Sequence, residues 1–279
     1  MRVIAESSST KSVWTLVENG NIIEKVKTEG INPFFQSRRE ISHIIRLGLP
    51  DSFFKRRWEH VDIYCAGCTS IEKKKIVEAS AVAQFKTPVT VESNLLGAAR
   101  GLLNDQSGIV CILDTGSSSC QYNGSEIVKQ VSALGFILGD EGSGASLGKM
   151  FISDCLKGLA PKHLTDLFFE RYNITTDVVM DEVYTTNSTN KWLSKYASFL
   201  HENIEDEYVY NLVRNELKRF FVRNILQYEY DKHSVSFMGE VACMFPDLLK
   251  EIAEELGVSI GTIQKNSLSG LVDFHSVEK

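Results

Sequence analysis

Two stretches of sequence share one pattern and decide the fold: Val3-Ile-Ala-Glu-Ser-Ser-Ser-Thr-Lys-Ser-Val-Trp-Thr-Leu-Val-Glu-Asn-Gly20 and Val110-Cys-Ile-Leu-Asp-Thr-Gly-Ser-Ser-Ser-Cys-Gln-Tyr-Asn-Gly124. Each copy reads as an apolar strand, an acid, a loop of small residues, a second strand and an Asn-Gly turn before a third strand. Asn-Gly between apolar-rich strands favours a hairpin whose two turn residues both have positive φ. The repetition predicts two domains that arose by duplication.

The loop of small residues in each copy is a candidate phosphate-binding loop. Such a loop at a strand end exposes backbone N–H groups to an anion, and a lysine in the first copy adds a mobile cation. Two such loops on opposite sides of a cleft would hold the phosphates of a nucleotide. The candidate phosphate-binding residues are Ser9, Thr10, Lys11, Thr115, Gly116 and Ser117.

Two acids, Glu6 and Asp114, occupy equivalent positions where the first strand of each copy ends. Carboxylates in such positions can hold Mg²⁺ through its bound waters, as nucleotide sites require. The alternative is that both acids only cap a turn. We predict that they contribute to a Mg²⁺ site.

Composition places the chain among globular proteins long enough for two domains: 279 residues, 43% hydrophobic and 24% charged. The net charge of −6 gives no general attraction to nucleic acid or to anionic membranes. We expect no signal peptide, no membrane span and a cytoplasmic location. Six cysteines are scattered, and Cys65 and Cys68 form a lone C-x-x-C without a second ligand pair, so we expect reduced thiols.

The first half alternates strands and helices, and the second half is mainly helical. We therefore expect an N-terminal domain over residues 1–124 and a helix-rich domain over 125–279, with the last helix packing back on the first domain. Apart from the two repeats, the expected strands are 61–66, 89–91, 235–238 and 259–263. The expected helices are 71–85, 93–103 with Ser93 as N-cap, 144–159, 164–172, 177–184, 191–200, 206–230 and 241–256.

Three further motifs have functional interpretations as well as ordinary structural ones. The carboxylates of Gly139-Asp-Glu-Gly-Ser-Gly144 suit the hydroxyls of a sugar, although acids also stabilise a helix N-terminus. Asn32 precedes a proline that holds it extended, so its amide has a defined direction, although the motif could be a simple turn. Gly239, at a strand-to-helix junction, would allow an adenosine to approach the backbone.

Together these motifs resemble the actin-like ATPase superfamily, in which duplicated ribonuclease H-like domains bind ATP between two phosphate loops. The chain is similar in particular to the N-acetylglucosamine kinase group, within the family that also holds benzoyl-coenzyme A reductase activator ATPases. The segments that carry the resemblance are Gly135–Gly144, Thr115–Ser117, Gly30–Pro33 and Asn94–Arg100. The resemblance implies an α/β fold of two duplicated ribonuclease H-like domains with a cleft between them.

The resemblance also implies ATP and Mg²⁺ as cofactors, an amino sugar as substrate, Gly239 beside adenosine and a possible homodimer. The positions that match the sugar-binding residues of the family are Asn32, Thr115, Gly135 and Asp140. Asn94 stands where the family has its catalytic aspartate. An amide cannot accept a proton near neutral pH, and losing a general base costs about 10²- to 10⁴-fold in rate.

Two other positions depart from the family pattern. Ser8 replaces a glycine of the first loop, and its side chain lies where backbone should approach phosphate. Asp114 restores an acid that the kinases usually lack, which would also permit ATP hydrolysis. The leading hypothesis is an ATP-dependent kinase of N-acetylglucosamine or a related amino sugar, weakened by Asn94. The alternatives are a degenerate sugar or nucleotide sensor and an ATPase of the activator type.

Overall fold

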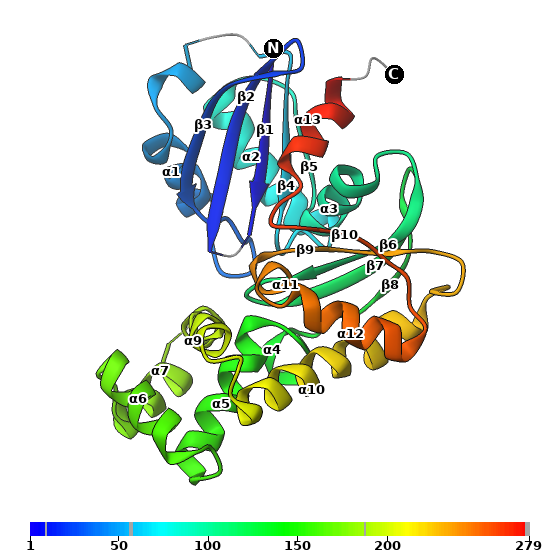
Figure 1. Ribbon diagram of the computed structural model, residues 1–279. Coiled ribbons are helices and arrows are strands. Elements are labelled where there is room, and N and C mark those ends of the chain that lie inside the picture. Colours follow the sequence, from blue (N-terminus) through cyan, green and yellow to red (C-terminus); the bar gives the residue numbers. More distant parts are fainter. Residues whose placement is uncertain (9, 56–57, 187, 277–279) are drawn as a thin grey trace. The chain divides into compact units, whose positions relative to one another are not determined.

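The computed structural model describes residues 1–8, 10–55, 58–186 and 188–276 (Figure 1). Its internal contacts divide the chain into two units. Unit 1 comprises Met1–Ser107, Tyr122–Ile127 and Asn266–Lys279, and unit 2 comprises Gly108–Gln121 and Val128–Lys265. This division differs from the predicted boundary after residue 124, because the strand that opens the second repeat pairs within unit 2.

A five-stranded sheet with the order β3-β2-β1-β4-β5 organises unit 1. The first three strands form an antiparallel meander, and β4 and β5 run parallel to β1. The strands are β1 (Arg2–Ser7), β2 (Lys11–Glu18), β3 (Asn21–Glu29), β4 (His60–Cys65) and β5 (Val89–Ser93). The helices are α1 (Arg38–Gly48), α2 (Ile71–Phe85), α3 (Asn94–Leu103) and α13 (Leu268–Ser276), with a 3₁₀ turn η1 (Asp51–Phe53).

Alternation along β1 shows that both faces of this sheet are buried. Val3 and Ala5 belong to the apolar cluster that includes residues of α1 and α2. Ile4 belongs to a second cluster, which includes Leu271 and Val272 of α13. Because neighbouring side chains of a strand point to opposite faces, α13 covers the face opposite to α1 and α2.

The sheet of unit 2 repeats this plan. Its order is β10-β9-β6-β7-β8. If the strands of each sheet are numbered from 1 to 5 along the chain, both sheets have the order 3-2-1-4-5, and the order of the second sheet is this one read from its other edge. β9 runs parallel to β6, and β10 runs parallel to β9. The strands are β6 (Ser107–Leu113), β7 (Ser117–Asn123), β8 (Ile127–Val131), β9 (Val235–Met238) and β10 (Ile260–Gln264). The predicted duplication within an α/β fold is therefore confirmed.

Helices make up most of the remainder of unit 2, around an aromatic core that includes Phe151, Phe168 and Phe199. Among the residues that the structure describes, no helix has the length and hydropathy needed to cross a bilayer. The helices are α4 (Gly135–Leu138), α5 (Gly144–Lys157), α6 (Lys162–Tyr172), α7 (Thr176–Tyr184), α8 (Thr189–Ser194), α9 (Ala197–Glu202), α10 (Glu207–Arg223), α11 (Glu240–Met244) and α12 (Pro246–Leu256), with a 3₁₀ turn η2 (Ile225–Gln227).

Three predicted helices are shorter or broken. The segment 241–256 is two helices, because Pro246 starts α12 and cannot donate a backbone hydrogen bond to the preceding turn. The segment 191–200 spans α8 and α9, and the helix predicted over 206–230 ends at Arg223. Helices α1 and α4 were not predicted.

The two Asn-Gly turns differ. Asn19 and Gly20 have φ values of 50° and 76°, as predicted. In the second repeat only Gly124 has positive φ, at 99°. The carboxamide oxygen of Asn123 instead accepts hydrogen bonds from the backbone N–H groups of Ser125 and Glu126, both at 2.9 Å. The predicted turn type is therefore wrong there, because an Asx turn closes the hairpin.

Candidate functional site

The acid of the first repeat is anchored by the C-terminal part of the chain. Glu6 lies at the end of β1, and its Oε1 accepts hydrogen bonds from the backbone N–H of Ser267, at 3.1 Å, and from the Ser267 hydroxyl. Burial raises the pKa of Glu6, although these hydrogen bonds oppose the rise. Sequence reasoning missed Ser267, because nothing in a local pattern connects residues 261 positions apart.

The first loop bonds to itself through Ser8. The Ser8 hydroxyl oxygen accepts hydrogen bonds from the backbone N–H groups of Thr10 and Lys11, both at 3.2 Å. Both N–H groups belong to the loop that the sequence predicts to bind phosphate. Thr10 and Lys11 are exposed, and Ser9 lies outside the described residues.

Asn32 lies in a tight turn beside the end of β1. Its carboxamide oxygen accepts a hydrogen bond from the N–H of Phe34 at 3.0 Å, and its own N–H donates to Gln36 Oε1 at 2.8 Å. The Ser7 hydroxyl joins this turn to the first loop, since it accepts from the N–H of Ile31 at 2.8 Å. Asn32 and the first loop are therefore held together within unit 1.

Asn94 is the first residue of α3 and is half-buried at the carboxyl end of β5. The predicted N-cap is confirmed: the hydroxyl of Ser93 accepts from the N–H of Leu96 at 3.2 Å. Strands β1, β4 and β5 are parallel, so Glu6 and Asn94 lie at the same edge of the sheet, where parallel strands end.

The second loop is built against the N-terminus of α5. The N–H of Gly144 donates to the carbonyl of Asp114 at 2.9 Å, and the N–H of Ala145 donates to that of Thr115 at 3.1 Å. Two helix N–H groups without intrahelical partners are satisfied in this way. The loop is thereby fixed to the helix that follows the Gly-Asp-Glu-Gly-Ser-Gly motif.

Asp140 lies directly beneath this loop. Its Oδ1 accepts a hydrogen bond from the N–H of Ser117 at 3.2 Å, and a Cβ on Gly116 would lie 3.0 Å from its Oδ2. The side chain is buried, and burial raises the pKa of Asp140 to about 6, with Glu141 adding to the rise and Lys149 opposing it. A φ of 58° at Asp140 turns the chain here.

Gly239 closes the same end of the unit 2 sheet. It follows β9 with a φ of 125°, and a Cβ there would overlap the carbonyl oxygen of Leu113 at the end of β6. Only glycine tolerates this backbone and this approach. Six of the predicted residues therefore meet in unit 2: Asp114, Thr115, Gly116, Ser117, Asp140 and Gly239.

Gly135 is the predicted residue of unit 2 that stands apart from this group. It starts α4 with a φ of 72°, is exposed, and has open space where a Cβ would be. Behind α4 lies a cavity of about 420 Å³ whose lining includes Leu134, Leu138 and the ion pair of Glu141 with Arg223, at 2.5 Å.

The two acids differ in their fit to Mg²⁺. Among the described residues, no group of three or more His, Cys, Asp or Glu side chains could hold a metal ion, so any Mg²⁺ would depend on water and on phosphate oxygens. Asp114 is half-buried at the second loop. Glu6 is half-buried as well, and its Oε1 is bonded to Ser267, so a Mg²⁺ water would have to compete with these hydrogen bonds for that oxygen.

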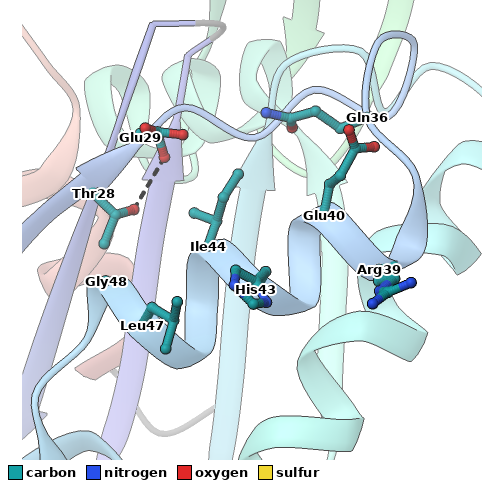
Figure 2. Close-up of a pocket in the computed structure, with 9 residues that line it drawn as sticks. All are labelled: Thr28, Glu29, Gln36, Arg39, Glu40, His43, Ile44, Leu47 and Gly48. Carbon is teal, nitrogen blue, oxygen red and sulfur yellow. Dashed lines mark hydrogen bonds between the residues drawn. The ribbon is translucent and has the colours of Figure 1, made fainter.

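A second cavity belongs to unit 1 and lies outside the candidate site, beside the edge strand β3. It has a volume of about 650 Å³ and lies between the end of β3 and helix α1 (Figure 2). Its connection to the site is Gln36, which lines the cavity and accepts the N–H of Asn32. The lining residues are Thr28, Glu29, Gln36, Arg39, Glu40, His43, Ile44, Leu47 and Gly48.

Comparison with solved structures gives full-length matches. A candidate N-acetylglucosamine kinase from Porphyromonas gingivalis is 35% identical, with 99% of each chain covered and a TM-score of 0.95. A candidate N-acetylglucosamine kinase from Chromobacterium violaceum is 15% identical, with 98% of each chain covered and a TM-score of 0.77. No protein-family model and no curated protein matches the chain.

A more distant match carries a ligand. A glucokinase of the ROK family from Streptomyces griseus, solved with glucose and AMPPNP, is 14% identical, covers 98% of this chain and 97% of its own, and has a TM-score of 0.59. At that identity the likeness shows the fold alone, which is the predicted two-domain fold of actin-like ATPase kinases.

Proposed function

Since the chain belongs to the N-acetylglucosamine kinase-like family of actin-like ATPases, we propose that it is an ATP-dependent kinase of N-acetylglucosamine or a related amino sugar. The observation that carries the proposal is the second loop: Thr115, Gly116 and Ser117 are fixed between the N-terminus of α5 and the Asp140 carboxylate. A family resemblance predicted phosphate and sugar contacts at these same positions.

The residues of each unit have their own proposed roles. In unit 2, the loop N–H groups and the Thr115 hydroxyl would bind phosphate, and Gly239 would lie against adenosine. The carboxylate of Asp140 would accept a hydrogen bond from a sugar hydroxyl. In unit 1, Lys11 would neutralise phosphate charge and Asn32 would orient the sugar. Asp114 would hold Mg²⁺ through water, and the ion would offset the charge that develops on the phosphates.

Phosphoryl transfer depends mainly on positioning and charge neutralisation. The hydrogen bonds that fix the second loop provide positioning before any ligand binds. Asn94, at the N-terminus of α3, would donate a hydrogen bond to the attacking hydroxyl without accepting its proton.

A coupled assay for ADP with a panel of amino sugars and hexoses tests the proposal. We expect ADP release that depends on N-acetylglucosamine or a related amino sugar, and a phosphorylated sugar in equal amount. No sugar-dependent ADP at high protein concentration, from the wild-type protein or from Asn94→Asp, would reject the kinase.

A sensor is the second candidate, and the first loop favours it. The Ser8 hydroxyl occupies the N–H groups of Thr10 and Lys11, and Asn94 removes the usual base. Thermal stabilisation by sugar or nucleotide without turnover would support a sensor, and measurable phosphorylated sugar would remove it.

A further inference from the structure

The substitution at Asn94 leaves the proposed reaction without its usual proton acceptor. A sugar hydroxyl that attacks phosphorus must lose its proton, and a carboxylamide cannot take it near neutral pH. If the chain is a kinase, another group has to serve, and carboxylates are the side chains of the candidate site that can.

The four carboxylates of the site differ in what they already contact. Glu6 is half-buried and bonded to Ser267, and Glu141 is buried and paired with Arg223 at 2.5 Å. Asp114 lies at the end of β6, where the phosphates and Mg²⁺ are proposed to bind. In the described chain Asp140 has no cationic partner at ion-pair distance, and the donor to its Oδ1 is the backbone N–H of Ser117.

We propose that Asp140 is the general base of this kinase, in the role that the family gives to the residue at position 94. The inference rests on the kinase activity proposed above. Its geometrical basis is that Oδ1 accepts the N–H of Ser117 and Oδ2 packs against Gly116, so the carboxylate is fixed at the second loop, where the phosphates are proposed to bind.

The step balances with the groups present. The sugar oxygen forms a bond to the γ-phosphorus, and the bond from that phosphorus to the β,γ-bridging oxygen breaks, so that ADP leaves with the electron pair. The hydroxyl proton passes to Oδ2 of Asp140 and is released to solvent after the product leaves. No oxidant, reductant or further reactant is needed.

The surroundings of Asp140 favour a base that works near neutral pH. Burial and the neighbouring Glu141 raise its pKa to about 6, and Lys149 is the opposing charge. A base is most effective when its pKa lies near the working pH. The rate should therefore fall as the pH drops below about 6, because Asp140 is then protonated.

Three variants test the inference: Asp140→Asn, Asn94→Asp and the double variant. We expect Asp140→Asn to lower kcat by about 10²- to 10⁴-fold and to abolish the acidic limb of the pH profile. The double variant should regain most of the lost kcat, with an acidic limb at lower pH, because a carboxylate then stands at position 94. Lys149→Met is the matched control: it should keep kcat within about 3-fold and shift the acidic limb to higher pH, because it removes a positive charge that lowers the pKa of Asp140.

Several results would overturn the inference. If Asp140→Asn raises the KM for sugar while kcat and the pH profile persist, Asp140 only binds the sugar. If kcat is lost and the double variant does not regain it, the role of Asp140 is structural. If neither the wild-type protein nor Asn94→Asp yields sugar-dependent ADP, the kinase proposal itself fails. Thermal melting curves of each variant show whether a loss of activity is due to unfolding.

Discussion

The two phosphate-loop candidates occupy the same place in sheets of the same strand order, yet they are held in different ways. In unit 2 the loop is braced from outside, by the N-terminus of α5 and by Asp140. In unit 1 the loop is braced from within, because Ser8 accepts the N–H groups of Thr10 and Lys11. The acid before each loop differs too, since Glu6 bonds to Ser267.

The difference indicates that duplication preserved the frame while the loops diverged in function. The bonds that brace the unit 2 loop use the N–H of Ser117 and the carbonyls of Asp114 and Thr115, and the N–H groups of Thr115 and Gly116 take no part in them. A loop braced from within has to exchange the Ser8 hydroxyl for a phosphate oxygen before it can bind. We therefore expect the loop of unit 2 to bind phosphate more tightly than the loop of unit 1.

The largest expected effect concerns the support of the unit 2 loop. Gly239→Ala places a Cβ against the carbonyl oxygen of Leu113 at a φ of 125°, and we expect it to lower the free energy of unfolding by about 4 kcal/mol. Urea unfolding measures this. Gly158→Ala is the control: its φ of 68° is also left-handed but nothing lies near its Cβ, so about 1 kcal/mol is expected. Equal losses would show that the Leu113 contact is unimportant.

Next in size is the cost of keeping Asp140 charged beneath that loop. Its pKa is raised from 3.8 to about 6, so the folded protein binds this proton more tightly than the unfolded chain does. Stability therefore falls as the pH rises from about 4 to about 6 and stays lowered above that range. We expect Asp140→Asn to raise the free energy of unfolding by about 2 kcal/mol near pH 7.5 and to change it little near pH 3.5. A variant that is less stable at both pH values would contradict this.

A smaller effect is expected at the equivalent acid of unit 1. Ser267→Ala removes one of the two donors to Glu6, and it should lower the free energy of unfolding by about 1–2 kcal/mol. Hydrogen exchange should show faster opening of the N–H groups of Thr10 and Lys11. Ser276→Ala, at the end of the helix that follows Ser267, removes a hydroxyl that donates to the Val272 carbonyl and should leave the first loop unchanged.

The smallest expected effect separates the two kinds of loop directly. Ser8→Gly frees the N–H groups of Thr10 and Lys11, and we expect nucleotide to bind about 3- to 10-fold more tightly, a gain of about 1 kcal/mol. Titration calorimetry with a non-hydrolysable ATP analogue measures it, with Ser118→Gly in β7 as the comparison variant. Weaker binding after Ser8→Gly would mean that the Ser8 hydroxyl itself contacts phosphate.

Sequence patterns were sufficient for the features that local rules control. Helix α2 lies at the predicted residues, and Ser93 caps α3 as expected, because apolar periodicity and capping are read within a few residues. Helix α1 was missed although Ser37 and Glu40 form a capping box, which is a local signal that could have revealed it. The break before Pro246 was also readable from the proline.

The features that escaped prediction depend on distant parts of the chain. The Glu6 contact with Ser267 joins the first strand to the residue that precedes the last helix, and Asp140 accepts the N–H of Ser117, 23 residues earlier in the chain. Of the residues assigned by family resemblance, Thr115, Asp140 and Gly239 form one group in unit 2 and Gly135 stands apart from it, whereas Asn32 and Asn94 belong to unit 1. Ligand contacts at those positions remain predictions for the experiments above.

Helix α13 also bears on the order in which the protein can be made. It follows the whole of unit 2 in the sequence, yet Leu268, Leu271 and Val272 fill one face of the unit 1 sheet. When only residues up to about 265 have left the ribosome, the sheet of the first unit therefore still has an uncovered apolar face. Unit 2, whose segments are complete by then, can fold first, and the earliest part of the chain is the last to be finished.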